Sequence, residues 1–187
     1  MKTIENKEFR NTSTGNDSTF LINTLKKHLK MESSVLLLGI GSGKDLSLLS
    51  NYFNVTGSDF SKLLLIVYQN SNPSADLITL DPIDLNTERK FDSVFSNKVL
   101  HQMTESDLVA SLENQIKLLN GGGLAIHSFW SGSKVEDHHG LKWVYYTEES
   151  LSRLIPDEFE VLELSTYKEK IDHDSICLLL KKKNLLL

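Results

Sequence analysis

Three glycines at alternate positions, Gly39, Gly41 and Gly43, separate an apolar run at 34–38 from an amphipathic stretch at 44–53. A short apolar run that ends in glycine is typical of a strand covered on both faces of a sheet. Glycine also allows a tight turn and a close approach of the backbone to a ligand. The stretch therefore predicts a buried strand, a glycine-rich loop that faces a nucleotide-type ligand, and a helix.

Segments of strand character alternate with segments of helix character along most of the chain. The expected strands are 33–39, 54–59, 75–81, 91–96, 124–130, 159–167 and 175–181. The expected helices are 18–30, 44–53, 61–70, 105–119 and 147–155. Ser18 is a residue of capping type, Asp45 suits the positive end of a helix dipole, and Gly121–Gly123 are expected to end the helix before them.

Alternating strands and helices indicate a parallel sheet covered on both faces. Only seven residues, 168–174, separate the last two strands. Such a connection is too short for a parallel crossover, so these strands are expected to pair antiparallel. The prediction is an α/β fold: a Rossmann-like, doubly wound, mostly parallel seven-stranded sheet with a C-terminal antiparallel strand pair.

Length and composition predict one soluble domain, residues 1–187, with 1–17 as a flexible N-terminal segment or lid. A net charge of −5 argues against nucleic acid as a partner, because phosphate binding depends on clustered Lys and Arg. The single cysteine, Cys177, excludes a disulfide framework and favours a reducing compartment. No apolar run approaches the roughly 18 residues needed to span a bilayer. We expect a cytoplasmic monomer or homodimer with no membrane partner.

Two phosphate-binding patterns fail at the glycine-rich loop. A P-loop would need glycine at Leu38 and Ser or Thr at Asp45, after Gly43 and Lys44. A dinucleotide fingerprint would need its third glycine at Lys44. The first pattern is excluded, and the second is disfavoured but stays open.

An acidic residue follows the second expected strand. Asp59 lies 20 residues after Gly39, and its carboxylate can accept hydrogen bonds from two ribose hydroxyls. Dinucleotide sites and other ribose-containing cofactor sites share this acid. Asp59 therefore predicts a ribose and leaves the identity of the cofactor open.

Motifs after several strands resemble those of class I S-adenosylmethionine-dependent methyltransferases. They are G-x-G-x-G after the first strand, Asp59 after the second, "LDPIDL" after the third and "FDSVFSNKVLHQM" at the fourth. "IKLLNGGGLAIHSF" resembles the family's turn into the fifth strand. The resemblance covers about residues 20–183 in the expected order. It implies an enzyme with S-adenosylmethionine as its cofactor.

The resemblance implies roles for the residues of the first two strand ends. Gly39, Gly41 and Gly43 would let the backbone approach the methionine half of the cofactor. Asp59 would hold the ribose, and Phe60 beside it would pack on the adenine face. Because this cofactor has no phosphate, the absence of a P-loop ending is consistent with it.

The third and fourth strand ends complete the implied cofactor site. Asp81 would accept from the adenine amino group, and Ser96 and Asn97 would line the methyl-bearing sulfonium. Two positions depart from the family pattern. Leu37 stands where an acidic residue usually holds the methionine amine, and Pro82 has no N–H to donate to adenine.

Methyl transfer is an in-line displacement that mainly requires alignment of the nucleophile. Where the acceptor arrives protonated, His101 is the candidate general base, because histidine has an ordinary pKa of about 6.5. Trp130, Ser131 and Tyr146 are candidates for the acceptor pocket, because ligands bind at the carboxyl ends of strands in open parallel sheets. His127, within a strand, is expected to be a core histidine.

The connection after the fifth expected strand carries a run of possible metal ligands: Glu136, Asp137, His138 and His139. Adjacent residues cannot all converge on one ion without a tight turn, and no distant partner residue stands out. We therefore predict a solvated loop and no metal site.

A small molecule is the expected acceptor. The "SNKV" stretch lacks the Asn/Asp-Pro-Pro-aromatic turn of enzymes that methylate base amines, and Cys177 is misplaced for a cytosine-carbon enzyme. Two alternatives stay open. One is a non-catalytic protein that binds S-adenosylmethionine or S-adenosylhomocysteine and regulates a partner, favoured by Leu37 and Pro82. The other is an NAD-dependent oxidoreductase.

Overall fold

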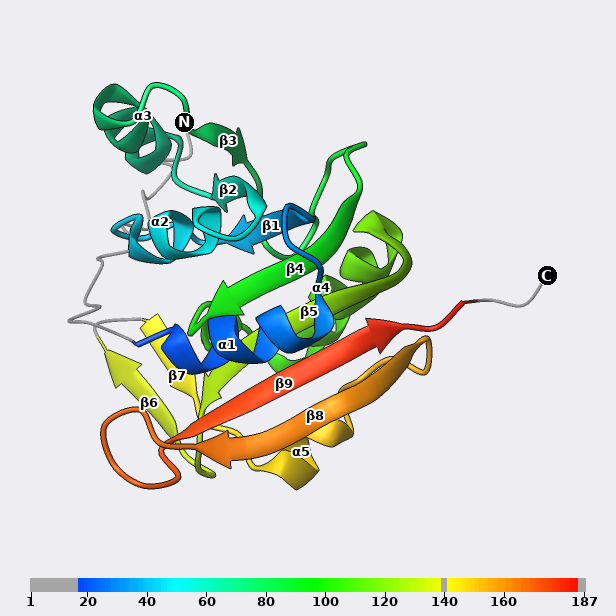
Figure 1. The fold of residues 1–187 in the computed structure, drawn as a ribbon. Helices are drawn as coiled ribbons and strands as arrows, with labels where there is room; N and C mark the ends of the chain where they lie inside the picture. Colours follow the sequence, from blue (N-terminus) through cyan, green and yellow to red (C-terminus); the bar gives the residue numbers. More distant parts are fainter. Residues whose placement is uncertain (1–16, 139–140, 185–187) are drawn as a thin grey trace, which may run out of the picture.

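A seven-stranded sheet forms the centre of the protein, whose computed structural model describes residues 17–138 and 141–184 (Figure 1). The order of strands across the sheet is β3-β2-β1-β4-β5-β9-β8. The strands are β1 (Ser34–Leu38), β2 (Asn54–Asp59), β3 (Asp76–Thr79), β4 (Phe91–Asn97), β5 (Leu119–Trp130), β8 (Phe159–Tyr167) and β9 (Ser175–Lys182). Residues 1–16 of the segment predicted to be flexible or a lid lie outside the described residues.

Strand directions follow the prediction. β1 pairs parallel with β2 and β4, β2 with β3, and β4 with β5, whereas β9 pairs antiparallel with both β5 and β8. The register brings Leu38, Ser58 and Ser96 side by side. The carboxyl ends of β1, β2 and β4 therefore meet at one edge, and the predicted fold class is confirmed.

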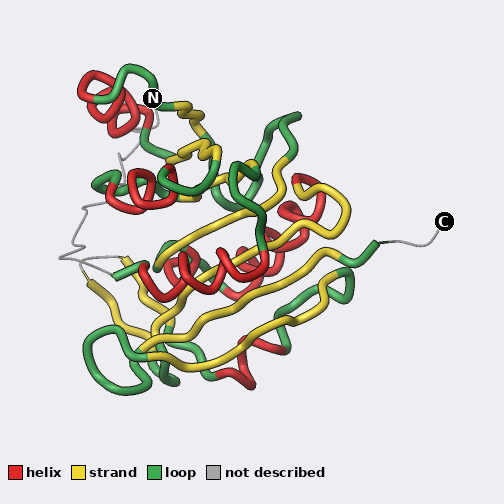
Figure 2. Tube along the Cα trace, in the orientation of Figure 1, coloured by secondary structure: helices red, strands yellow, loops and turns green. Residues whose placement is uncertain are grey.

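Helices cover both faces of this sheet (Figures 1 and 2). They are α1 (Thr19–His28), α2 (Lys44–Ser50), α3 (Lys62–Ser71), the 3-10 turn η1 (Leu100–Gln102), α4 (Glu105–Leu118) and α5 (Glu148–Ser152). Within the described ranges, none of them combines the length and apolar character that crossing a membrane requires.

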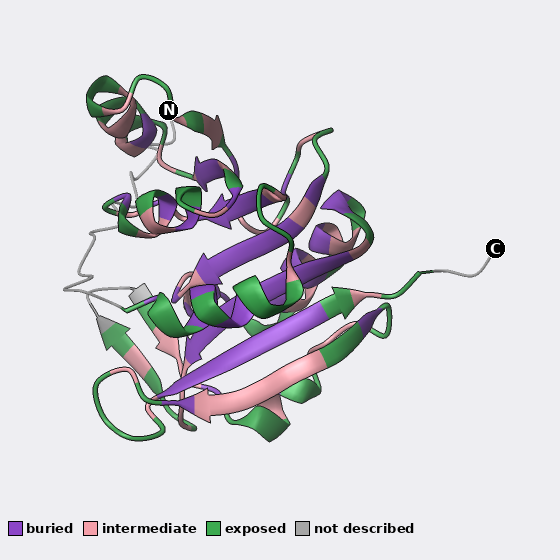
Figure 3. Cartoon of the chain, viewed as in Figure 1, coloured by how far each residue is buried: buried purple, intermediate pink, exposed green. Residues whose placement is uncertain are grey.

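The strands at the centre of the sheet are largely buried (Figure 3), and their side chains form two cores, one on each face. Val35 and Leu37 of β1 pack on one face with residues of α1, α2 and α3. Leu36 and Leu38 pack on the other face with residues of α4 and α5. Successive strand residues point to opposite faces, so a continuous apolar strand such as β1 needs cover on both sides. Cys177 of β9 is buried, and burial raises the pKa of its thiol to about 12.

The connection after β5 is a hairpin, so the predicted solvated loop is wrong. β6 (Val135–His138) and β7 (Leu141–Val144) pair antiparallel, with Glu136 opposite Trp143 and Asp137 opposite Lys142. An opposite-charge pair and β-branched or aromatic residues stabilise neighbouring strands. The charged residues of β6 are typical of a loop, so the sequence pattern did not predict a strand here. His139 lies outside the described residues.

The chain enters β5 earlier than predicted. α4 ends at Leu118, and β5 begins at Leu119 and passes through the three glycines, with a register shift opposite 91–93. A Cβ at Gly123 would lie 3.0 Å from the Asn120 oxygen and 3.1 Å from the Asp92 oxygen. Glycine at 123 therefore allows the backbone of β5 to pass close to these two oxygens where the register with β4 shifts. The prediction that the glycines end the helix is wrong, because β5 already begins at Leu119.

Candidate functional site

The glycine-rich loop is held tightly between its neighbours. Gly39, Gly41 and Gly43 have φ values of 72°, 50° and 82°, in the left-handed region. A Cβ at Gly39 would lie 2.8 Å from Cγ2 of Val99, and a Cβ at Gly43 would lie 1.9 Å from Cε2 of Tyr68. Residues with side chains cannot replace either glycine without a shift of the packed neighbours.

Asp59 ends β2 against this loop. Its carboxylate accepts a hydrogen bond from the Ser61 N–H at 2.9 Å. Burial raises the pKa of Asp59, while the N–H groups of Ser61, Gly41 and Ile40 act in the opposite direction. The N–H groups of Gly39 and Ile40 donate to the carbonyl of Ser58 at 2.8 and 3.0 Å, so the end of β2 lies against the loop. This arrangement fits a ribose whose hydroxyls donate to Asp59.

Two further predicted contacts to adenine lie at strand ends. Phe60 follows Asp59 and is 55% exposed, so its ring is available for stacking. Oδ1 of Asp81 accepts from the Ile83 N–H at 2.7 Å, and the Pro82 carbonyl accepts from the Ser111 hydroxyl at 2.6 Å. Asp81 therefore shapes its own turn, and Pro82 ties that turn to α4.

Ser96 and Asn97 differ in what their side chains contact. The Ser96 hydroxyl is buried and hydrogen-bonded to Nδ1 of His127 at 2.8 Å. Nε2 of His127 lies 2.9 Å from Oε1 of Gln115, so His127 is the core histidine that its position in a strand predicted. Oδ1 of Asn97 accepts from the Ser128 hydroxyl at 2.6 Å. Of the two, only Asn97 joins the polar contacts at the strand end.

Asp45 contributes a contact that sequence reasoning missed. Its carboxylate accepts from the Ser18 hydroxyl at 2.6 Å and from Nδ2 of Asn97 at 3.2 Å. The Ser18 hydroxyl makes no cap hydrogen bond to α1. Burial raises the pKa of Asp45, and both hydrogen bonds oppose that shift. A helix-start pattern correctly places both residues, but it does not show that they meet.

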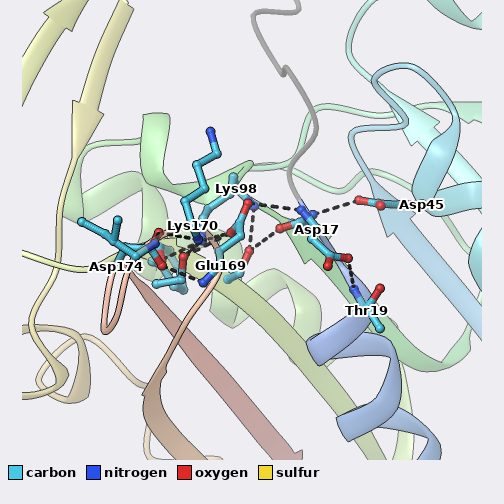
Figure 4. A network of polar contacts seen from close by, with 12 residues as sticks. Asp17, Thr19, Asp45, Lys98, Glu169, Lys170 and Asp174 are labelled. Carbon is cyan, nitrogen blue, oxygen red and sulfur yellow. Dashed lines mark hydrogen bonds and ion pairs between the residues drawn. The ribbon is translucent and has the colours of Figure 1, made fainter.

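A buried ion pair lies beside these residues and was also missed (Figure 4). Nζ of Lys98 is 3.1 Å from Oε2 of Glu169, and both side chains are only 1% exposed. Nζ also donates to the Phe129 carbonyl at 3.0 Å and lies 4.3 Å from the Trp130 ring centroid. Burial lowers the pKa of Lys98 to about 8 against the opposing effect of Glu169. Nothing in the 168–174 sequence signals this partner.

His101 lies in η1 and is 2% exposed. Its ring meets Trp143 of β7 edge-on, with centroids 5.4 Å apart and planes at 88°. Burial, followed by the charge of Lys98, lowers the pKa of His101 to about 3. Neither ring nitrogen has hydrogen-bond geometry with a partner among the described residues. The ordinary pKa that suggested a general base is therefore not retained, and the imidazole is neutral near pH 7.

The predicted acceptor-pocket residues lie together at the end of β5. Ser131 and Tyr146 form a β-bridge, and the Tyr146 N–H donates to the Trp130 carbonyl at 3.0 Å. Tyr146 is buried edge-on against Phe129, and its hydroxyl has no partner within the described part of the chain. Burial raises the pKa of that hydroxyl to about 12. The structure thus places the buried polar groups of His101 and Tyr146 on the segments that follow β4 and β5.

Acidification is expected to destabilise the protein through its two buried histidines. His101 and His127 have pKa values of about 3 when folded, against about 6.5 when unfolded. Below pH 6.5 the unfolded chain binds protons that the folded chain refuses, so stability present above 6.5 is lost as pH falls. Each histidine should cost about 2 kcal/mol between pH 7.5 and 5.

Urea unfolding of wild type and His101→Gln at pH 7.5 and 5 measures this effect. The variant should lose about 2 kcal/mol less than wild type between the two pH values, because one of the two histidines is gone. Equal losses would contradict a neutral, buried His101.

Comparison with known proteins shows which proteins share this fold. Residues 35–123 match the family model of the methyltransferase domain. The matched segment is a methyltransferase domain, and solved S-adenosylmethionine-dependent methyltransferases share the fold of this chain. Both findings support the methyltransferase class predicted from the sequence.

Several solved structures share the fold at low sequence identity. An S-adenosylmethionine-dependent methyltransferase from Clostridium acetobutylicum is 18% identical, with a TM-score of 0.73, over 89% of this chain and 91% of that chain. The 1,6-didemethyltoxoflavin-N1-methyltransferase of Burkholderia thailandensis is 18% identical, with a TM-score of 0.75, over 89% and 78%. The glycopeptide N-methyltransferase MtfA, complexed with S-adenosylmethionine, is 13% identical, with a TM-score of 0.71, over 90% and 95%. No curated protein matched the chain in sequence.

Proposed function

We propose that this protein transfers a methyl group from S-adenosylmethionine to a small-molecule acceptor. The observation that carries the proposal is the position of Asp59 beside the glycine-rich loop. The N–H groups of Gly39 and Ile40 donate to the carbonyl of Ser58, the residue before Asp59, at 2.8 and 3.0 Å, so a ribose acceptor adjoins the loop. The cofactor supplies an electrophilic methyl group on a sulfonium. The residues of the chain bind, orient and shield the reactants.

Each end of the cofactor has a proposed partner. The glycine-rich loop would take the methionine half, Asp59 the ribose, and Phe60 and Asp81 the adenine. Asn97, at the end of β4, would face the sulfonium, and Ser96 would contribute backbone alone because its hydroxyl bonds to His127. This division follows the order of strand ends along the sheet.

On the acceptor side, His101 would accept or donate a hydrogen bond without taking up a proton. A group with a pKa of about 3 is a weak base near pH 7, so alignment of the acceptor is its main contribution. The Tyr146 hydroxyl is the second buried polar group available to an acceptor, and Trp130 and Ser131 would complete the wall. A buried polar group without a protein partner is costly unless a ligand or water satisfies it.

Two steps test the proposed function. Calorimetric titration with S-adenosylmethionine, S-adenosylhomocysteine and NAD comes first; we expect micromolar binding of the first two. Transfer of labelled methyl to a panel of phenols, amines, N-heterocycles and short peptides comes second; we expect a small molecule to be labelled. Binding of NAD alone would overturn the proposal, and labelling of peptides alone would overturn the small-molecule acceptor. Cofactor binding without turnover on any acceptor would favour the regulatory role.

His101→Gln and Tyr146→Phe sharpen the second step. Each should lower kcat/KM for the labelled acceptor by about tenfold, which is the loss of one hydrogen bond of roughly 1.4 kcal/mol. Cofactor affinity should stay within twofold, because neither residue is assigned to the cofactor. Loss of cofactor affinity in either variant would count against this division of the site.

We also propose that the chain acts as one domain in the cytoplasm, as a monomer or homodimer, with the residues before α1 as a lid. The net charge of −5 and the single, buried cysteine support this setting. Size-exclusion chromatography with light scattering measures the oligomeric state, and a higher oligomer would contradict it.

A further inference from the structure

Lys98 holds an unusual backbone conformation directly after Asn97. Its φ is 54°, in the left-handed region that side-chain-bearing residues rarely adopt. Such a conformation is strained and persists only where surrounding contacts enforce it. The strain lies one residue beyond the proposed sulfonium contact.

The Lys98 ammonium supplies the enforcing contacts. It pairs with Glu169, donates to the Phe129 carbonyl at 3.0 Å and to the Ser175 hydroxyl at 2.8 Å, and lies over the Trp130 ring. These partners come from β5, β9 and the β8–β9 loop. A buried ammonium with this many partners cannot rotate away without leaving Glu169 unpaired in the interior.

The Lys98 backbone in turn fixes Asn97. The Lys98 N–H donates to the Ser128 hydroxyl oxygen at 3.0 Å, and that hydroxyl donates to Oδ1 of Asn97 at 2.6 Å. Nδ2 of Asn97 donates to Asp45 at 3.2 Å. Both ends of the Asn97 amide are therefore held, one of them through Ser128 and Lys98.

The contacts close into a ring through the start of α1, and Figure 4 shows four of its members, Lys98, Glu169, Asp17 and Asp45. Asp45 accepts from the Ser18 hydroxyl, and the N–H of the preceding residue, Asp17, donates to Oε1 of Glu169 at 3.2 Å. Glu169 completes the ring at the Lys98 ammonium. Asn97 therefore contacts members of this ring on both sides, Asp45 through Nδ2 and Ser128 through Oδ1.

We propose that Lys98 is a positioning residue of the methyl-transfer site that acts through Asn97. The proposal rests on the proposed function, because it assigns Asn97 to the sulfonium. The buried ion pair holds residue 98 left-handed, this conformation aims its N–H at Ser128, and Ser128 fixes the Asn97 amide. Without the ammonium, residue 98 relaxes to negative φ and the amide loses its fixed direction.

The double variant K98M/E169Q tests this by removing both charges together, so that no lone buried charge remains. We expect S-adenosylmethionine, measured by calorimetry, to bind about tenfold more weakly, the equivalent of one hydrogen bond. The matched control is K134M/E136Q, which removes another Lys–Glu pair near the end of β5, with side chains 59% and 32% exposed. The control should change affinity less than twofold.

A glycine variant separates backbone direction from charge. K98G/E169Q also lacks the ion pair, but glycine adopts positive φ without strain. Its affinity for S-adenosylmethionine should return to within about threefold of wild type. A loss as large as that of K98M/E169Q would overturn positioning through the backbone.

A mutant cycle that combines S128A with K98M/E169Q tests whether Lys98 acts on Asn97 through Ser128. S128A leaves the ion pair in place and breaks only the link, so it should also weaken binding about tenfold. The triple variant S128A/K98M/E169Q should bind no more weakly than S128A, because contacts in one pathway are non-additive. Independent losses that multiply to about a hundredfold would overturn the proposal.

The outcomes stay distinguishable from failure of the proposed function. Wild type that binds no S-adenosylmethionine contradicts the function itself. Wild type that binds it while S128A and K98M/E169Q bind equally well contradicts only the role of Lys98. If K98M/E169Q fails to fold by circular dichroism, S128A and K98G/E169Q decide the question.

Discussion

Replacing Asp59 with alanine should weaken S-adenosylmethionine binding by about a hundredfold. Hydrogen bonds to a charged acceptor contribute about 1.5–3 kcal/mol each, and two ribose hydroxyls are expected to donate to this carboxylate. Asp59 also accepts the Ser61 N–H at the start of α3, so the alanine variant loses a turn contact as well. Calorimetry with S-adenosylmethionine and S-adenosylhomocysteine measures the effect, and both ligands should weaken equally because they share the ribose.

Asp59→Asn is the matched variant. Its side-chain oxygen can still accept from Ser61, but the charge is gone and only one oxygen remains. We expect an intermediate loss of about tenfold with little change in melting temperature. Unchanged affinity in Asp59→Ala would show that the ribose lies elsewhere.

Gly43→Ala should both destabilise the protein and remove cofactor binding. A Cβ at residue 43 would lie 1.9 Å from the ring of Tyr68, and φ there is 82°. The left-handed conformation alone costs about 1–2 kcal/mol for a residue with a Cβ, and the clash adds to it. For a chain of this size, 1 kcal/mol lowers the melting temperature by about 2–4 °C, so a fall of about 5–12 °C is expected.

Two variants identify the cause of that fall. Gly43→Ala combined with Tyr68→Ala removes the clash and keeps the strained φ, so thermal unfolding should show only partial recovery relative to Tyr68→Ala alone. Gly121→Ala is the control, because its φ is not positive and its nearest neighbour is the end of the Asn184 side chain at 3.2 Å. Equal melting temperatures for Gly43→Ala and Gly121→Ala would contradict the packing described for the loop.

Most of the fold could be predicted from local patterns in the sequence. The apolar run of β1 required cover on both faces, and Val35 and Leu37 indeed pack opposite Leu36 and Leu38. The short connection before β9 allowed only an antiparallel pair. Both inferences depend on near neighbours in the chain, which is why the sequence was sufficient for them.

Two predictions from the sequence were wrong, both where long-range contacts override the local pattern. The charged residues of β6 and β7 suggested a loop, but cross-strand pairing makes them a hairpin. The glycines before 124 suggested a helix end, whereas at least Gly123 permits the backbone approach at the irregular start of β5.

By itself, the amino-acid sequence determined the class of fold, the glycine-rich loop and the acid at the end of the second strand, because each depends on residue type and spacing. Only the tertiary structure decided the protonation of His101 and the ring through Lys98 and Glu169. Burial sets the first, because a low dielectric disfavours the charged imidazole. The second joins residues 71 positions apart, and no local pattern encodes which distant side chains will share an interior site.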